Sequence, residues 1–201
     1  MRRRNVPHRE ALQDFSITGD GIRIVPFLRE YLEALAQWDV HESNLYREYN
    51  YADFTREELE QWHAERTDRR NQYYAVFYED ALIGFVGLKQ ISWIRRSSVL
   101  GYAIDPKFAG KGLGTKVLDL FLHHYFKTLR FRSMELYVYA YNQRAIHLYE
   151  KLGFVIQGIS YDVFHNPENF PSEDEIKQYS EVLNQKKDHV LAQVLHMRTR
   201  R

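Results

Sequence analysis

Hydrophobic residues along this chain follow two periods, which separate predicted strands from predicted helices. Apolar residues alternate or run together between turn residues in stretches that we predict to be strands: 21–26, 72–78, 81–91, 97–104, 134–139, 154–164 and 189–197. They recur at three- and four-residue spacing in stretches that we predict to be helices: 28–38, 55–66, 113–129, 142–151 and 175–183. Only Glu79-Asp80 separates two of the strands, so we expect a hairpin there and an antiparallel meander over 72–104.

This order of elements indicates an α/β (α+β) fold in a single domain that covers residues 21–201. The chain has 201 residues, enough for one substantial core, and its 44% hydrophobic and 27% charged residues are ordinary for a globular protein. No repeat, low-complexity tract or convincing linker divides it. Residues 1–20 are polar and irregular, and we expect them to form a flexible N-terminal segment.

Charge and cysteine content narrow the classes of function. The formal net charge of +1 gives no reason to expect a nucleic acid or a membrane surface as partner. Cysteine is absent, so disulfide and thiol chemistry are excluded. No run approaches the roughly 18 apolar residues of a membrane span, and the basic start Met1–Asn5 is not followed by an apolar signal core. We therefore expect a cytoplasmic protein without nucleic-acid or membrane partners.

The adjacent pair His123-His124 is the one histidine pattern that raises the question of a metal site. Side chains at neighbouring helical positions diverge, and no further ligand stands four residues on. We interpret the pair as part of a solvated helix face and predict no metal.

The most informative stretch is the turn from Asp105 to Lys116, which reads Asp-Pro-Lys-Phe-Ala-Gly-Lys-Gly-Leu-Gly-Thr-Lys. It joins a predicted strand to a predicted helix, with glycines at 110, 112 and 114. Glycine lets the backbone turn tightly, and the first N–H groups of a helix lack internal partners and carry the positive end of its dipole. The turn is therefore a candidate phosphate site.

Two common phosphate-binding loops do not fit this turn. A nucleotide P-loop requires Gly-x-x-x-x-Gly-Lys-Ser/Thr, whereas here Thr115 precedes Lys116 and the spacing differs. A dinucleotide fingerprint requires Gly-x-Gly-x-x-Gly in a βαβ unit, whereas here Gly-x-Gly-x-Gly follows a meander. A plain strand-to-helix turn without a ligand is the remaining alternative on the glycines alone.

Two blocks of the sequence resemble the GCN5-related N-acetyltransferase (GNAT) superfamily. Leu100-Gly101-Tyr102-Ala103-Ile104-Asp105-Pro106, followed by Gly110-Lys111-Gly112-Leu113-Gly114-Thr115, is similar to the family's fourth strand and acetyl-coenzyme A loop. Asn142-Gln143-Arg144-Ala145-Ile146-His147-Leu148-Tyr149-Glu150-Lys151-Leu152-Gly153-Phe154 is similar to its other signature, in the family's order and at about its spacing. Residues 22–27 also resemble the opening strand of the branch that acetylates ribosomal-protein N-termini and polyamines.

The resemblance implies a fold, a cofactor and a reaction. The fold would be a GNAT fold with a mixed central sheet of six to seven strands, a splayed cofactor edge and about four flanking helices. The cofactor would be acetyl-CoA, released as CoA after direct transfer of its acetyl group to a primary amine in a ternary complex. The implied cofactor-binding residues are Tyr102, Ala103, Ile104, Ala109, Gly110, Lys111, Gly112, Leu113, Gly114, Thr115 and Asn142.

One position departs from the family pattern. The family's Arg/Gln, three residues before the middle glycine of the loop, falls on Ala109. Because that position contributes mainly its backbone N–H, alanine is compatible with binding. A guanidinium contact to phosphate, worth about 1–3 kcal/mol as a charged hydrogen bond, is absent. Lys107, Lys111 or Lys116 would partly replace it.

The resemblance also assigns the general acid. Acetyl transfer requires a proton for the leaving thiolate, and Tyr149 matches the tyrosine that the family uses for this purpose. A phenol with an unperturbed pKa of about 10 is protonated at neutral pH. The alternative for Tyr149 is packing on the helix face that it shares with Ala145 and Leu148. Asn142 would either contact the pantetheine arm of the cofactor or cap its helix.

The general base is less sharply defined by the sequence. Glu135 lies in the middle of a predicted strand beside the expected cofactor edge, and it is our candidate for the residue that takes the proton of the amine. Pairing with an arginine is the alternative role for this carboxylate. Glu42, Glu79 and Asp162 are other candidates for the base.

In the family, the acceptor enters opposite the cofactor, which here corresponds to residues 40–54 and 165–187. These regions carry aromatic and acidic residues that suit a cationic amine: Tyr46, Tyr49, Tyr51, Glu168, Phe170, Glu173, Asp174 and Glu175. The alternative is that both regions are solvated loops. The acceptor would be a protein N-terminus, a polyamine or another small amine. A homodimer through the sheet edge is compatible with the sequence. The competing hypothesis is a non-catalytic acetyl-CoA sensor of the same fold.

Overall fold

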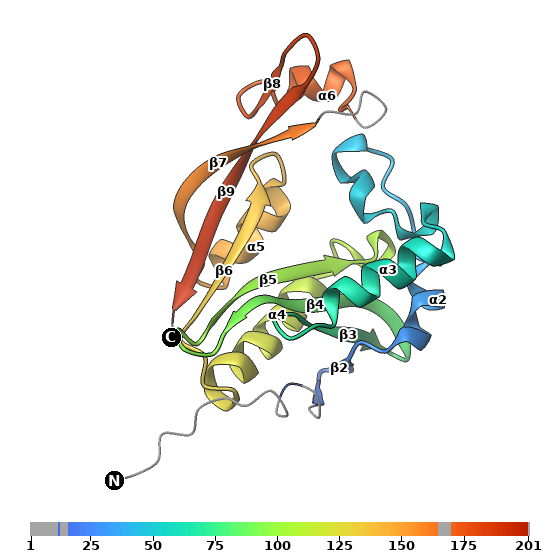
Figure 1. Cartoon of the computed structure of the whole chain (residues 1–201), viewed down its shortest axis with the longest axis vertical. Coiled ribbons are helices and arrows are strands. Elements are labelled where there is room, and N and C mark those ends of the chain that lie inside the picture. Colours follow the sequence, from blue (N-terminus) through green and yellow to red (C-terminus); the bar gives the residue numbers. More distant parts are fainter. Residues whose placement is uncertain (1–11, 13–15, 165–169, 201) are drawn as a thin grey trace.

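A single mixed sheet forms the centre of the protein (Figure 1). The computed structural model describes residues 12, 16–164 and 170–200. Within these ranges the strands are β1 (Ile17–Gly19), β2 (Ile22–Pro26), β3 (Gln72–Tyr78), β4 (Ala81–Ser92), β5 (Ser97–Ile104), β6 (Ser133–Tyr139), β7 (Val155–Phe164), β8 (Leu183–Gln185) and β9 (Val190–Arg200). The nine strands follow the order β1-β2-β3-β4-β5-β6-β9-β7, with β8 paired to β9. The pairing of β5 with β6 is parallel, and the other described pairings are antiparallel.

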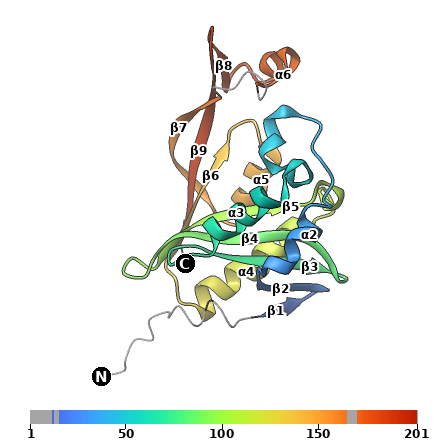
Figure 2. The ribbon, with the colours of Figure 1, turned by 45° about the vertical axis from the view of Figure 1, so that its right-hand side comes forward.

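Helices cover both faces of this sheet (Figure 2). The helical segments are η1 (Arg29–Tyr31), α2 (Leu32–Leu35), η2 (Asn44–Tyr49), η3 (Tyr51–Asp53), α3 (Arg56–Arg66), η4 (Pro106–Phe108), α4 (Leu113–His123), η5 (His124–Thr128), α5 (Gln143–Lys151) and α6 (Glu173–Gln178). Helices α4 and α5 share one apolar cluster with the sheet, whereas α2 and α3 belong to a second cluster on the opposite face. Strand β3 shows why two layers form, because Tyr74 and Val76 enter the first cluster while Tyr73 and Ala75 enter the second.

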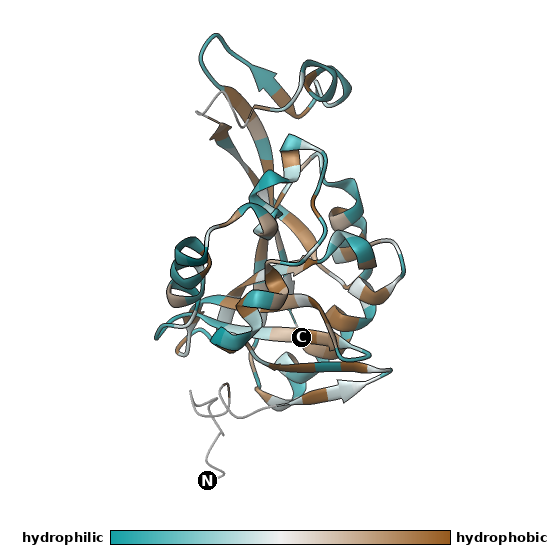
Figure 3. Ribbon diagram, turned by 90° about the vertical axis from the view of Figure 1, so that its right-hand side faces the viewer, coloured by the Kyte–Doolittle hydropathy of each residue, from teal (hydrophilic) through white to brown (hydrophobic). Residues whose placement is uncertain are grey.

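The C-terminal arm, which consists of β7, α6, β8 and β9, extends beyond the rest of the sheet (Figure 1). Hydrophilic residues cover α6 at its tip (Figure 3). A third apolar cluster joins Leu45 of η2 and Tyr141 to Leu183, Val190 and Ala192 of the arm. Segments that are more than 100 residues apart in the sequence therefore pack against one another here.

The predicted hairpin and meander are confirmed, since β3, β4 and β5 pair in sequence as antiparallel neighbours. Two predictions near the N-terminus differ from the structure. Residues 17–19 form β1 inside the segment expected to be irregular, because the turn at Asp20-Gly21, with φ values of 53° and 76°, folds them onto β2. Residues 1–11 and 13–15 of that segment lie outside the described ranges. The helix predicted over 28–38 is shortened to η1 and α2, and beyond it Trp38 donates its indole N–H to the Leu82 carbonyl at 3.0 Å.

Two further differences lie in the C-terminal arm. The helix predicted over 175–183 begins at Glu173 and ends at Gln178, because Ser172 and Glu175 form a capping box at its start. Residues 183–185 instead form β8, a strand of three residues that is too short to show a period. With β1 and β8 the sheet has nine strands, rather than the expected six to seven.

A helix that spans a membrane must be long and apolar. In the part of the chain that the structure describes, every helix is too short or too polar to cross a bilayer.

Candidate active site

The two central strands β5 and β6 separate and open a cleft in the middle of the sheet. Their parallel pairing joins only Ser97–Val99 to Ser133–Glu135. Beyond this point, Leu100–Ile104 of β5 and Leu136–Tyr139 of β6 line a cavity instead of pairing with each other. The other edge of each strand stays paired, β5 with β4 and β6 with β9. The facing edges therefore offer backbone N–H and C=O groups to an extended ligand.

The glycine turn borders the same cavity. Gly110 and Gly112 have φ values of 77° and 76°, a left-handed conformation that L side chains rarely adopt. No atom lies within 4 Å of a Cβ built on either glycine, so the backbone here faces open space. Gly112 is the N-cap of α4 and makes no side-chain cap bond. The first N–H groups of this helix, beside Gly114 and Thr115 on the cavity wall, are therefore available to an anion such as phosphate.

Ala109 contributes to this turn in a different way from the one we expected. It lines the cavity, but its N–H donates to the Pro106 carbonyl at 3.0 Å within the short helix η4. That N–H is therefore not free for a ligand. Contacts from the turn to a phosphate group would begin at Gly110.

One continuous cavity joins the cleft to the opposite face of the sheet. Its volume is about 1200 Å³, above the roughly 300–1,000 Å³ of typical small-molecule sites. We call the part between β5, β6, the glycine turn and α5 the cofactor half, after the prediction from the sequence, and the part lined by η2, η3, α3 and β7 the acceptor half. A cavity of this size and shape has room for two substrates that meet between the halves.

Tyr149 of α5 stands where the two halves meet. It lines the cavity, its side chain is buried, and within the described residues its hydroxyl makes no hydrogen bond. Burial raises the pKa of Tyr149 well above its usual range, so the phenol stays protonated at neutral and alkaline pH. Tyr149 also lies within electrostatic range of Tyr102 in the cofactor half and Tyr49 in the acceptor half. It combines a packed ring with a hydroxyl that can donate a proton into the cavity.

Asn142 caps α5 and also lines the cavity. Its Oδ1 accepts a hydrogen bond from the N–H of Ala145 at 3.1 Å, which is the capping role that the sequence left open. Its amide nitrogen has no part in this cap. Asn142 therefore fixes the start of the helix that carries Tyr149 while keeping a donor at the cavity wall.

The carboxylates of Glu48 of η2 and Asp162 of β7 line the acceptor half, together with Glu58 and Glu65 of α3. Asp162 Oδ2 accepts a hydrogen bond from the Tyr139 hydroxyl at 2.8 Å. Burial raises the pKa of Glu48, and the nearby Asp162 raises it further, while Tyr49 and Lys89 act in the opposite direction. Glu48 keeps an exposed surface, which borders the cavity. Such a group suits proton acceptance from a cationic amine.

Tyr141 and the C-terminal arm hold η2 in place on this side. Tyr141 donates its hydroxyl to the Leu45 carbonyl at 2.8 Å, and Asn44 donates its side-chain amide to the Phe170 carbonyl at 2.9 Å. Ser43, the N-cap of η2, donates to Glu175 of α6. The position of Glu48 is therefore decided by contacts from two distant parts of the chain, at residue 141 and at residues 170–175.

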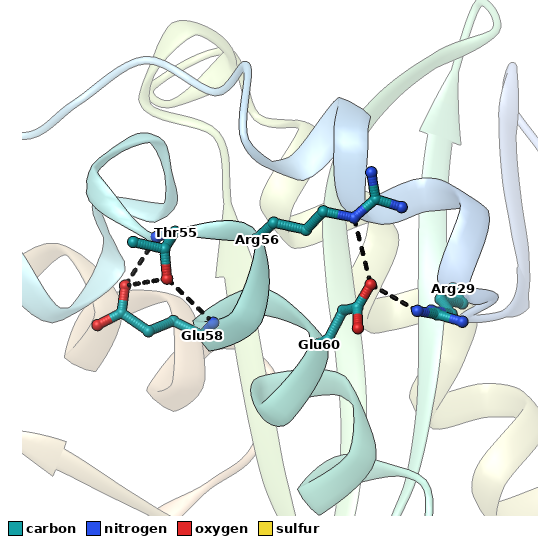
Figure 4. A network of polar contacts seen from close by, with 5 residues as sticks. All are labelled: Arg29, Thr55, Arg56, Glu58 and Glu60. Carbon is teal, nitrogen blue, oxygen red and sulfur yellow. Dashed lines mark hydrogen bonds and ion pairs between the residues drawn. The ribbon is translucent and has the colours of Figure 1, made fainter.

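Helix α3 forms the opposite wall of the acceptor half. Its start is fixed by a capping box in which Thr55 and Glu58 each accept from the other's backbone N–H (Figure 4). Glu60 also pairs with Arg29 and Arg56 on the outer surface (Figure 4). These contacts support the inward residues Trp62 and Arg66, which line the cavity.

The expected site residues divide into those that reach the cavity and those that do not. Residues on the cavity wall are Tyr102, Ala103, Ile104, Ala109, Gly110, Gly112, Gly114, Thr115, Asn142 and Tyr149. Leu113 is buried in the core, and the ammonium of Lys111 lies over the Phe108 ring at 5.2 Å. The expected acceptor tyrosines 46, 49 and 51 line the cavity, whereas residues 170 and 173–175 do not, and Glu168 lies outside the described ranges.

Glu135 is not positioned as the general base that the sequence suggested. It is absent from the cavity wall, and its Oε1 lies 3.6 Å from the Nε of Arg198 on the neighbouring strand β9. The alternative role, pairing with an arginine, is therefore the one observed. Glu42 and Glu79 also do not reach the cavity, but Asp162 does.

Sequence reasoning missed Glu48, Arg66, Lys89 and His41, all of which line the cavity. Burial and the charge of Arg144 lower the pKa of His41, and Asn50 holds its backbone through hydrogen bonds of 2.7 and 3.0 Å. His41 and Glu48 come from a segment without a clear period, whereas Arg66 and Lys89 lie in the predicted helix 55–66 and strand 81–91. Only their proximity in space identifies the four as site residues. No group of three or more potential metal ligands occurs among the residues that the structure describes.

Comparisons with known proteins agree with this arrangement. The model described as the acetyltransferase (GNAT) family matches residues 33–154. The spermidine N(1)-acetyltransferase of Escherichia coli (strain K12) is 32% identical over 91 residues, which cover 45% of this chain and 49% of that protein. The Vibrio cholerae enzyme of the same name is 39% identical over 83 residues, 40% of this chain and 48% of that protein. The chain thus spans about half the length of the curated relatives it matches.

A solved structure shows the same fold over most of the chain. The spermidine N-acetyltransferase from Vibrio cholerae, in complex with CoA and spermine, superposes with a TM-score of 0.66 at 22% identity. The superposition covers 90% of this chain and 96% of the other. The similarity therefore extends from the cleft to the C-terminal arm.

Proposed function

This chain belongs to the acetyltransferase (GNAT) family, and from that premise we propose that it transfers an acetyl group from acetyl-CoA to a primary amine of a small molecule or peptide. The observation that carries the proposal is the shared cavity. It brings the separated edges of β5 and β6, the open glycine turn and Tyr149 together with the carboxylates of Glu48 and Asp162. The named substrate of the spermidine acetyltransferase relatives supports an amine as acceptor.

The residues of the cofactor half fit acetyl-CoA. Bound acetyl-CoA would supply a thioester whose acetyl group is activated for attack by an amine. The amides at the start of α4 would bind its pyrophosphate, in space that no side chain fills at Gly110 and Gly112. The free edge of β5 from Leu100 to Ile104 would bind the pantetheine arm as an added strand.

Tyr149 and Glu48 divide the proton transfers between them. Glu48 would take a proton from the ammonium of the acceptor, directly or through water, which frees the nitrogen lone pair to form the C–N bond. As the C–S bond breaks, Tyr149 would give its phenolic proton to the sulfur. The second proton that the nitrogen loses on becoming an amide would pass through water to the Tyr149 phenolate, which restores the acid. Asp162, held by Tyr139 at 2.8 Å, would hold the cationic acceptor beside Glu48. The raised pKa of Glu48 suits an acceptor of protons at neutral pH, and the raised pKa of Tyr149 keeps its phenol protonated there.

The test is an acetyl-transfer assay with a panel of amines. The protein is mixed with acetyl-CoA and each amine, the release of CoA thiol is followed with a thiol reagent, and the acetylated amine is identified by mass spectrometry. We expect thiol release that depends on the amine. Cofactor binding without release across the panel would instead support the sensor of the same fold. A protein that binds neither acetyl-CoA nor CoA would refute both functions.

A further inference from the structure

Two cationic side chains, Arg66 at the end of α3 and Lys89 on β4, line the acceptor half of the cavity. Arg66 is firmly held there. Its Nη1 donates to the Trp62 carbonyl at 3.0 Å, and its guanidinium carbon lies 4.5 Å from the centre of the Trp62 ring and 5.8 Å from that of Tyr73. Arg66 therefore presents a fixed charge to the cavity.

Lys89 and Tyr73 converge with Arg66 over Gly101 of β5. The Lys89 Cδ lies 3.6 Å from the position that a Cβ on Gly101 would occupy, and the Tyr73 hydroxyl lies 2.8 Å from it. Gly101 is also part of the cavity wall. Because glycine has no side chain, the polar ends of the three neighbours gather above the strand, next to the cleft between β5 and β6.

In the part of the chain described, the two cations have little direct pairing with carboxylates, although Glu58 and Glu65 of α3 also line the cavity. Lys89 makes no ion pair there, and the pair of Arg66 is with its neighbour Glu65, at 3.6 Å, whose side chain is 60% exposed. Burial and the charge of Arg66 lower the pKa of Lys89, and the opposing effect of Glu48 is the smallest of the three. Two like charges in a partly desolvated wall repel each other, and a bound anion would relieve that repulsion.

We propose that the acceptor carries an anionic group, a carboxylate or a phosphate, in addition to its amine, and that Arg66, Lys89 and the Tyr73 hydroxyl bind this group. The proposal rests on the proposed function and specifies its substrate class. Guanidinium and ammonium donors form strong charge-assisted hydrogen bonds to either anion. Glu48 and Asp162 bind the ammonium end of the same molecule. A polyamine, which has only cationic groups, would be repelled by Arg66 and Lys89.

The test uses amines of one chain length that end in a carboxylate, a phosphate, a carboxamide or a second ammonium group. We measure kcat/KM with saturating acetyl-CoA, and separately the binding of each amine to the CoA complex by calorimetry. We expect an anionic acceptor to exceed the carboxamide and the diamine by about tenfold or more, as a charged hydrogen bond would provide. Comparison of the amine that ends in a carboxylate with the amine that ends in a phosphate shows which anion the site binds.

A matched pair of variants connects this preference to the site. In Lys89→Met, the advantage of the anionic acceptor over the carboxamide should collapse, chiefly through KM. In Lys127→Met, which alters an exposed lysine of η5 away from the cavity, the advantage should persist. Equal behaviour of the two variants, a preference for the diamine, or no binding of any anionic amine would overturn the proposal. Binding of the anionic amine without turnover would uphold it and refute the proposed transferase function instead.

Discussion

Tyr102 at the end of β5 donates its hydroxyl to the carbonyl of Gly114 in the first turn of α4, at 3.2 Å. This bond joins the strand edge to the helix start on either side of the glycine turn. A Cβ on Gly114 would lie 3.0 Å from the same hydroxyl, so the two residues are in close contact. The bond fixes the direction of the helix N–H groups relative to the free edge of β5, and both are needed to bind one extended cofactor.

Replacement of Tyr102 by Phe should therefore weaken both stability and cofactor binding. Loss of the hydrogen bond should lower the free energy of unfolding by about 0.5–1.5 kcal/mol. The freed helix start should weaken acetyl-CoA binding severalfold. Denaturant unfolding and calorimetry measure the two effects. Tyr161→Phe, at a residue that is 64% exposed, is the control and should change neither. A Tyr102→Phe protein with wild-type cofactor affinity would contradict the role of this bond.

Tyr149→Phe should lower the rate of acetyl transfer while leaving acetyl-CoA affinity unchanged. General acid catalysis contributes about 10²–10⁴-fold, so we expect kcat to fall in that range. Because burial raises the pKa of Tyr149, the wild-type rate should show no alkaline decline at the usual tyrosine pKa. Steady-state kinetics over a pH series and cofactor titration check both statements. An unchanged kcat would leave Tyr149 a packing residue.

Gly112→Ala should disturb the turn through its backbone and not through a clash. The position has φ 76° and open space around a Cβ. A left-handed alanine costs about 1–2 kcal/mol, and relief of that strain would move the amides of the turn and weaken cofactor binding. Gly158→Ala is the matched control, because its Cβ also meets open space but its φ lies outside the left-handed range. Calorimetry with CoA should separate the two variants, and equal affinities would argue against a cofactor at this turn.

Glu48→Gln should raise stability at neutral pH and lower activity. Burial raises the pKa of Glu48 in the folded protein, so the folded state holds this proton more tightly than the unfolded chain. The stability of the wild type is therefore reduced as pH rises from the unfolded pKa of about 4.3 through the raised folded pKa. Below the unfolded pKa the carboxyl group is protonated in both states, so it does not reduce the stability of the wild type. The Tm of Glu48→Gln should exceed that of the wild type at pH 8 and match it near pH 4.

The control for this experiment is Glu181→Gln, which alters an exposed carboxylate outside the cavity. Its Tm should follow the wild type at both pH values, and its acetyl-transfer rate should be unchanged. A Glu48→Gln protein that loses stability at pH 8 would show that the carboxylate is instead a stabilising ion in the wall.

The cofactor half of the site could be predicted from the sequence because its residues lie close together along the chain. The stretch 100–116 and the block 142–154 are continuous segments, and ten of the residues expected from them lie on the cavity wall: Tyr102, Ala103, Ile104, Ala109, Gly110, Gly112, Gly114, Thr115, Asn142 and Tyr149. The hydroxyl cap at Thr55 and the meander of β3, β4 and β5 were predictable for the same reason. Each depends on neighbours within a few residues.

The residues of the acceptor half could not be predicted from the sequence, because they come from segments that are distant along the chain. Glu135 looked suitable in the sequence, but the pairing of β6 with β9 places it opposite Arg198, 63 residues later. Glu48 had no clear signal, since η2 has no regular period and is held at the cavity by contacts with Phe170 and Tyr141. The sequence by itself determined most of the helices and strands and the glycine turn, because local periodicity and glycine conformation set them. Only the tertiary structure decided which charges meet in the cavity, because strand pairing and packing of the arm bring those charges together.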